Sequence, residues 1–175
     1  AELAFGLMSS MLRNIPSSFE DVKVGGWDYD MHMGHQLKGK TIGIIGYGRL
    51  GKMMTDYCYA FGMNTLPYDP YKFDADFELL LKISDVISLH VHANDETRHM
   101  INKKTLGKMK NNSYIVNTSR GEIVNEHDIV DALRSGKLKG YATDVIEDEY
   151  GNRENSPILN GIKEGFHKEV DNEMI

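Results

Sequence analysis

From Lys40 onward, short apolar runs rich in β-branched residues alternate with helical patterns. The strand-like runs lie at 41–45, 64–68, 86–89, 114–117 and 140–145, and the helical patterns lie at 49–62, 76–82, 103–109 and 125–135. Parallel strands need crossover helices of this kind, and the right-handed crossover rule winds the units onto both faces of one sheet. The alternation therefore predicts an α/β fold with a doubly wound parallel sheet.

A length of 175 residues suffices for one domain of ordinary size. We expect its core at 40–175, preceded at 1–39 by an opening helix and a connecting segment. Apolar residues at three- and four-residue steps predict that the opening helix spans Glu2–Arg13. In the polar, Gly-containing stretch that follows, we expect Trp27 to be the one large apolar anchor.

Composition excludes several other classes of protein. The net charge of -6, with acidic and basic residues mixed along the chain, provides no basic stripe for nucleic acid. No apolar run approaches the roughly 20 residues that span a bilayer. The single cysteine, Cys58, excludes an internal disulfide and suits a reducing compartment, so we expect a cytoplasmic protein. The chain begins without methionine and stops at the approach to a strand, which favours a fragment.

The turn after the first strand carries the pattern G-x-G-x-x-G and opens a helix. Gly46 permits a tight turn, Gly48 lets the backbone approach a pyrophosphate, and Gly51 lets helix and strand pack closely. Free N–H groups at the helix start, from Arg49 and Leu50, suit phosphate oxygens. The pattern predicts a Rossmann-type dinucleotide site, and three glycines in an ordinary strand-helix turn are the alternative.

An acid follows the second strand at the place where such folds meet the adenosine ribose. Asp69 should accept hydrogen bonds from the ribose hydroxyls. Its charge would repel a 2'-phosphate and no arginine adjoins it, so NAD is favoured over NADP. The alternative is a solvated loop aspartate beside Pro70.

Several motifs after the glycine turn occur together in one known family. They are Ser88-Leu89-His90-Val91, Asn117-Thr118-Ser119-Arg120-Gly121, and Thr143-Asp144-Val145 followed by Glu149. This combination resembles the NAD-binding domain of the D-isomer-specific 2-hydroxyacid dehydrogenases, which include phosphoglycerate, glycerate and lactate dehydrogenases. The resemblance implies hydride transfer between NAD(H) and a small 2-keto or 2-hydroxy acid. Without the resemblance, Arg120 and Glu149 would be read as a solvated surface pair.

The resemblance also implies roles for individual residues. Arg120 corresponds to the arginine that clamps the substrate carboxylate, and Glu149 to the glutamate that pairs with a catalytic histidine. Asp144 falls where the family holds the nicotinamide carboxamide. Thr118 and Ser119 fall under the nicotinamide ribose. His90 and Thr97 fall in the adenine and pyrophosphate region.

In the resembled family the catalytic histidine lies in a T-P-H stretch, which these 175 residues do not contain. His167 is the one histidine after Glu149, and it lies too early in the sequence to correspond to that catalytic histidine. The resemblance also implies a substrate domain built from segments on both sides of the cofactor domain, so we expect a fragment that binds cofactor without turnover. A non-catalytic dinucleotide-sensing protein similar to transcriptional corepressors is the alternative. An adenosylhomocysteine hydrolase is disfavoured by Ser119-Arg120-Gly121.

Two expectations concern partners and metals. In the resembled family the helix at Glu2–Arg13 packs across a two-fold interface, and its apolar face suits a homodimer. The alternative is that this face packs only on its own sheet. His90 and His92 have no acidic or cysteine partner at ligand spacing, so we expect no metal site.

Overall fold

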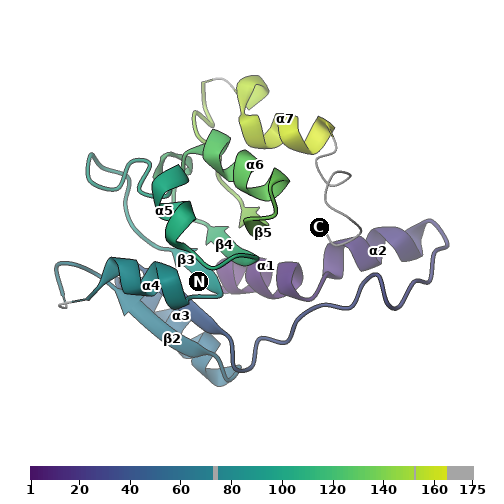
Figure 1. Cartoon of the computed structure of the whole chain (residues 1–175), viewed down its shortest axis with the longest axis horizontal. Coiled ribbons are helices and arrows are strands. Elements are labelled where there is room, and N and C mark those ends of the chain that lie inside the picture. Colours follow the sequence, from purple (N-terminus) through teal and green to yellow (C-terminus); the bar gives the residue numbers. More distant parts are fainter. Residues whose placement is uncertain (73–74, 152, 165–175) are drawn as a thin grey trace.

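The computed structural model describes residues 1–72, 75–151 and 153–164. Its centre is a five-stranded parallel sheet with helices on both faces (Figure 1). The strands are β1 Thr41–Ile45, β2 Asn64–Tyr68, β3 Val86–Leu89, β4 Ser113–Asn117 and β5 Leu138–Thr143. Their order is β2-β1-β3-β4-β5, so the direction of winding reverses between β1 and β3. The predicted doubly wound parallel sheet is confirmed.

The helices between the strands match the predicted helical patterns to within two residues, and they are α3 Arg49–Ala60, α4 Phe77–Ile83, α5 Lys103–Lys108 and α6 Glu126–Arg134. The helices α1 Glu2–Leu12 and α2 Ile15–Lys23 precede β1, and α7 Pro157–Glu164 follows β5. The sequence pattern predicted neither α2 nor α7. Short 3-10 turns occur at η1 Gly121–Ile123 and η2 Arg153–Asn155. Asn125 caps α6 by accepting a hydrogen bond from the Asp128 N–H at 3.1 Å. In the described part of the chain, no helix has the length and apolar character needed to cross a membrane.

Alternate residues of the central strands point to opposite faces of the sheet. Ile42 and Ile44 of β1 lie in the core beneath α1 and α3, where Met54 is also fully buried. Ile45 and Ile87 point the other way, into the core beneath α4, α5 and α6. Covering both faces explains why these strands are almost wholly apolar.

The apolar stripe of α1 lies in the chain's own core. Met8 and Leu12 are fully buried, and Met11 is 7% exposed and packs close to Gly140 of β5. The expectation that this stripe docks on a second copy is therefore wrong for these three side chains, because they cover one face of their own sheet. Leu3 remains exposed on the helix.

Part of the expected connecting segment is helical. Pro16 stands at the start of α2, where its missing N–H costs nothing, and Asn14 turns the chain there with a φ of 53°. The helix leaves α1 and extends away from the sheet (Figure 1), and none of its residues is buried. Trp27 is 86% exposed, so the expectation that it anchors the segment is wrong. Among the described residues, neither core cluster includes a side chain of α2 or Trp27.

Candidate functional site

The candidate residues gather at one edge of the sheet. The glycine turn follows β1, Asp69 follows β2, His90 follows β3, Thr118 to Arg120 follow β4, and Asp144 follows β5. Because the strands are parallel, all these positions lie at their carboxyl ends, and the reversal between β1 and β3 opens a crevice there. Ligands of open α/β sheets bind at this position.

The glycine turn is closely packed on the protein side and open on the other. Gly46 has a φ of +95°, and a Cβ there would lie 2.6 Å from the carbonyl group of His90. A Cβ at Gly51 would lie 2.1 Å from the Gly46 oxygen, so helix and strand can approach only without one. A Cβ at Gly48 would meet no protein atom within 4 Å. Gly48 therefore leaves space for a ligand beside the free N–H groups at the start of α3.

A cavity of about 410 Å³ continues from this turn. Its lining includes the predicted cofactor residues Gly46, Gly48, Asp69, His90 and Thr97. The turn presents N–H groups for phosphates and the cavity ends at a carboxylate suited to ribose hydroxyls. This combination fits the adenosine and pyrophosphate half of a dinucleotide.

Asp69 is a buried, ionised carboxylate. Its Oδ2 accepts a hydrogen bond from the Tyr47 N–H at 3.2 Å and lies 2.9 Å from Lys72 Nζ. Its Oδ1 accepts from the Tyr71 N–H at 3.2 Å. The hydrogen bond from Lys72 is the main reason that the pKa of Asp69 lies below its ordinary value. A solvated loop aspartate would not be held in this way.

His90 is a neutral side chain in the same cavity. Its Nε2 lies 2.9 Å from Ser88 Oγ, and burial lowers its pKa to about 4. A neutral imidazole suits contact with an adenine ring better than capture of an anion. Thr97 closes the loop beyond it by donating a hydrogen bond from Oγ1 to the His92 carbonyl oxygen at 2.6 Å.

The turn after β4 fixes the backbone that carries Arg120. Ser119 donates from Oγ to the Leu89 carbonyl oxygen at 2.6 Å, and its N–H donates to Asn117 Oδ1 at 3.1 Å. Asn117 Nδ2 in turn donates to the Arg120 carbonyl oxygen at 2.9 Å. Thr118 is half-buried within the turn, whereas the Arg120 side chain is exposed and donates from Nη1 to the Ser119 carbonyl oxygen.

The loop after β5 packs directly against this turn. A Cβ at Gly121 would lie 2.0 Å from the carbonyl carbon of Ile146, so only glycine permits the approach. The loop carries Asp144, which is exposed, and Glu149, which is half-buried. Within the described residues, no ion pair joins Arg120 to Glu149. The fold thus brings the two loops together without pairing these two side chains.

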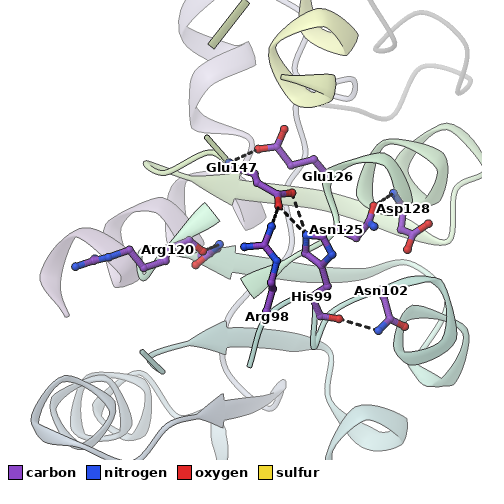
Figure 2. Close-up of polar contacts among 9 residues, drawn as sticks. Arg98, His99, Asn102, Arg120, Asn125, Glu126, Asp128 and Glu147 are labelled. Carbon is purple, nitrogen blue, oxygen red and sulfur yellow. Dashed lines mark hydrogen bonds and ion pairs between the residues drawn. The ribbon is translucent and has the colours of Figure 1, made fainter. Parts of the chain in front are cut away.

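A polar cluster ties the loop after β3 to the loop after β5. Glu147 Oε1 lies 2.8 Å from Arg98 Nη2 and 2.9 Å from His99 Nε2. The Glu147 N–H donates to Oε1 of Glu126 at 2.8 Å, and Glu126 is only 3% exposed. Figure 2 shows Arg98 and His99 pointing toward Glu147 while Arg120 points away from this cluster. The cluster holds the loop that carries Glu149.

Sequence reasoning missed two parts of this arrangement. Lys72 lies three residues after Asp69, and that spacing was a usable signal for an ion pair. Glu126 follows the α6 cap and resembles an ordinary first-turn acid, so no pattern marked it as buried. The prediction about His167 and the expectation that the chain stops at the approach to a strand lie outside the described residues.

Comparison with known proteins identifies the type of domain. Residues 5–163 match the family model described as D-isomer specific 2-hydroxyacid dehydrogenase, NAD binding domain. The chain is 40% identical over 160 residues to D-3-phosphoglycerate dehydrogenase of Methanocaldococcus jannaschii, covering 85% of the chain and 30% of that protein. It is also 40% identical over 180 residues to glyoxylate reductase of Thermococcus litoralis, covering 93% and 54%.

A solved structure shows the same fold with the cofactor bound. The NAD-dependent formate dehydrogenase of Staphylococcus aureus in complex with NAD matches with a TM-score of 0.85 and 33% identity, covering 91% of this chain and 50% of that one. The chain thus spans about half, or less, of the length of these relatives. Its glycine turn and cavity are suited to the same cofactor. The chain belongs to the D-isomer-specific 2-hydroxyacid dehydrogenases and carries their NAD-binding domain.

Proposed function

We propose that this domain serves an oxidoreductase that transfers hydride between NAD(H) and a 2-keto acid or D-2-hydroxy acid. The observation that carries the proposal is the exposed Arg120 guanidinium on a fixed turn at the same sheet edge as the cofactor cavity. A planar guanidinium can hold a carboxylate bidentately. The relatives are named for different substrates, phosphoglycerate, glyoxylate and formate, so the proposal extends only to the class of acid.

Each residue of this edge has a proposed task. When bound, the nicotinamide supplies or accepts the hydride. Arg120 holds the substrate carboxylate and polarises the keto oxygen, while Asp144 binds the carboxamide and Thr118 and Ser119 lie under the nicotinamide ribose. Glu149 keeps the catalytic histidine basic, and that histidine is expected in a T-P-H stretch that these 175 residues do not contain.

The experiment compares two lengths of chain with NADH and a panel of 2-keto acids. The 175 residues alone should bind NADH without measurable turnover, because loss of a proton donor costs about 10²- to 10⁴-fold. A version that includes the flanking substrate domain and the histidine should turn over. In that version Arg120→Ala should lower kcat/KM about 100-fold or more, and Arg120→Lys should lower it less, because lysine keeps the charge but loses the bidentate geometry.

Three results would count against the proposal. Full turnover by the Arg120→Ala variant would remove the arginine from the mechanism. Turnover by the 175 residues alone, abolished by His167→Ala, would show that the base had been misplaced. A longer chain that binds NADH but reduces no 2-keto acid would favour a dinucleotide sensor.

We further propose that two copies associate as a homodimer, through α2 and the segment after it instead of the buried stripe of α1. Several large apolar side chains of this region are more than half exposed, and they include Phe19, Val24, Trp27 and Met33. A monomer seldom leaves such a group uncovered, and a closed two-fold dimer would cover the same patch on both copies.

A further inference from the structure

Lys72 places a cation on the carboxylate that meets the cofactor ribose. Its Nζ lies 2.9 Å from Asp69 Oδ2 and donates to the Tyr47 carbonyl oxygen at 2.8 Å. The Asp69 side chain is 11% exposed, whereas the Lys72 side chain is 45% exposed. The lysine therefore bridges the ribose end of the site to the glycine turn, and its outer side faces solvent.

This bridge leaves Asp69 little capacity for a ribose. An ionised carboxylate has about four acceptor positions. The Tyr47 N–H, the Tyr71 N–H and Lys72 Nζ occupy three of them. A ribose diol that donates two hydrogen bonds therefore needs one of these donors to withdraw. Lys72 is the donor that can move, because the other two belong to the backbone.

Lys72 also cancels the charge by which Asp69 would reject a 2'-phosphate. A bare carboxylate repels a phosphate monoester, which carries a charge of about -1.5 to -2 at neutral pH. When Asp69 is paired with Lys72, the net charge of the two side chains is close to zero. Among the described residues that line the cavity, Lys72 is the single lysine or arginine. Its flexible stem lets the ammonium group turn from the carboxylate to a phosphate oxygen.

We propose that Lys72 determines cofactor selectivity by admitting the 2'-phosphate of NADP, so that Asp69 discriminates against NADP only modestly. With NAD bound, the ammonium group gives up its hydrogen bond to Asp69, so that the ribose diol can donate two hydrogen bonds to the carboxylate. With NADP bound, the ammonium group leaves Asp69 and pairs with the 2'-phosphate. The inference rests on cofactor binding at this edge and is independent of the proposed substrate.

Fluorescence titration of the 175-residue chain with NADH and NADPH tests the proposal. The wild-type chain should bind both, with NADH tighter. Lys72→Met keeps most of the stem and removes the charge, and it should raise the Kd for NADPH about tenfold or more, as expected for loss of a charge-assisted hydrogen bond. The Kd for NADH should change less than about threefold, because Tyr47 and Tyr71 still hold Asp69.

Matched variants separate this role from a general effect of charge. Lys72→Arg should retain NADPH binding. Asp69→Asn should bring the Kd values for NADH and NADPH closer together. Lys82→Met, which removes an exposed lysine of α4 outside the cavity lining, should leave both Kd values unchanged. Titration with 2',5'-ADP and 5'-AMP should repeat the selectivity without the nicotinamide half. Circular dichroism confirms that each variant is folded.

The outcomes distinguish this inference from the proposed function. If Lys72→Met weakens both cofactors equally, or tightens NADPH, Lys72 has no selective role and the hydride-transfer proposal is untouched. If a folded wild-type chain binds neither cofactor, both proposals fail together. Selective loss of NADPH and 2',5'-ADP on Lys72→Met supports the assignment.

Discussion

His90 links one residue of the cofactor cavity to the pH dependence of folding. Burial lowers its pKa from 6.5 to about 4, so the unfolded chain binds a proton in this range when the folded chain does not. The contribution to stability is present above about pH 6.5 and is lost as the pH falls toward 4, by at most about 3 kcal/mol. The free energy of unfolding, measured by chemical denaturation between pH 7.5 and 4.5, should fall less steeply with falling pH for His90→Gln than for wild type. His127→Gln, at an exposed position, should behave as wild type, and identical slopes for all three would contradict the assignment.

At the scale of elements, one buried side chain of α6 holds the segment between β5 and α7. Glu126 accepts from the Glu147 N–H with one oxygen and from Ser156 Oγ at 2.7 Å with the other. Glu126→Ala leaves both donors without their acceptor and should cost about 2–4 kcal/mol of unfolding free energy, whereas Glu126→Gln can satisfy both and should cost less than about 1.5 kcal/mol. Asp131→Ala, exposed on the same helix, should stay within about 0.5 kcal/mol of wild type. Equal losses for the first two variants would contradict this assignment, because the isosteric amide would then hold the segment no better than a methyl group.

At the scale of the whole molecule, α2 and its following segment should decide the oligomeric state. Sedimentation at micromolar concentration should show a dimer, because the exposed apolar side chains there have no cover in the described residues. Phe19→Glu should give a folded monomer, since Phe19 is 63% exposed and supports no core. Tyr59→Glu, at a position on α3 that is also more than half exposed, should remain dimeric. A wild-type chain that stays monomeric at high concentration would end the dimer proposal.

Much of the fold could be predicted because its signals are local. Strand and helix periodicity and the glycine turn each depend on residues close in sequence, and the structure confirms the predicted strands, the helices between them and the turn. The sequence by itself also determined that the glycine turn and Asp69 would meet at one sheet edge, because parallel strands end together. Its motifs indicated the family that the comparisons then showed.

Only the tertiary structure decided which surfaces are covered and which charges are paired. The stripe of α1 and the side chain of Trp27 are both apolar, yet the first lies in the core and the second is exposed. The reason is that α1 lies against a face of the sheet, whereas the segment that carries Trp27 does not. Glu126 and Lys72 resemble ordinary surface charges in the sequence. The partners of Glu126 lie on other elements, and contacts of that kind depend on packing that no local pattern records. The spacing of Asp69 and Lys72 permits an ion pair, but only the folded turn after β2 forms it.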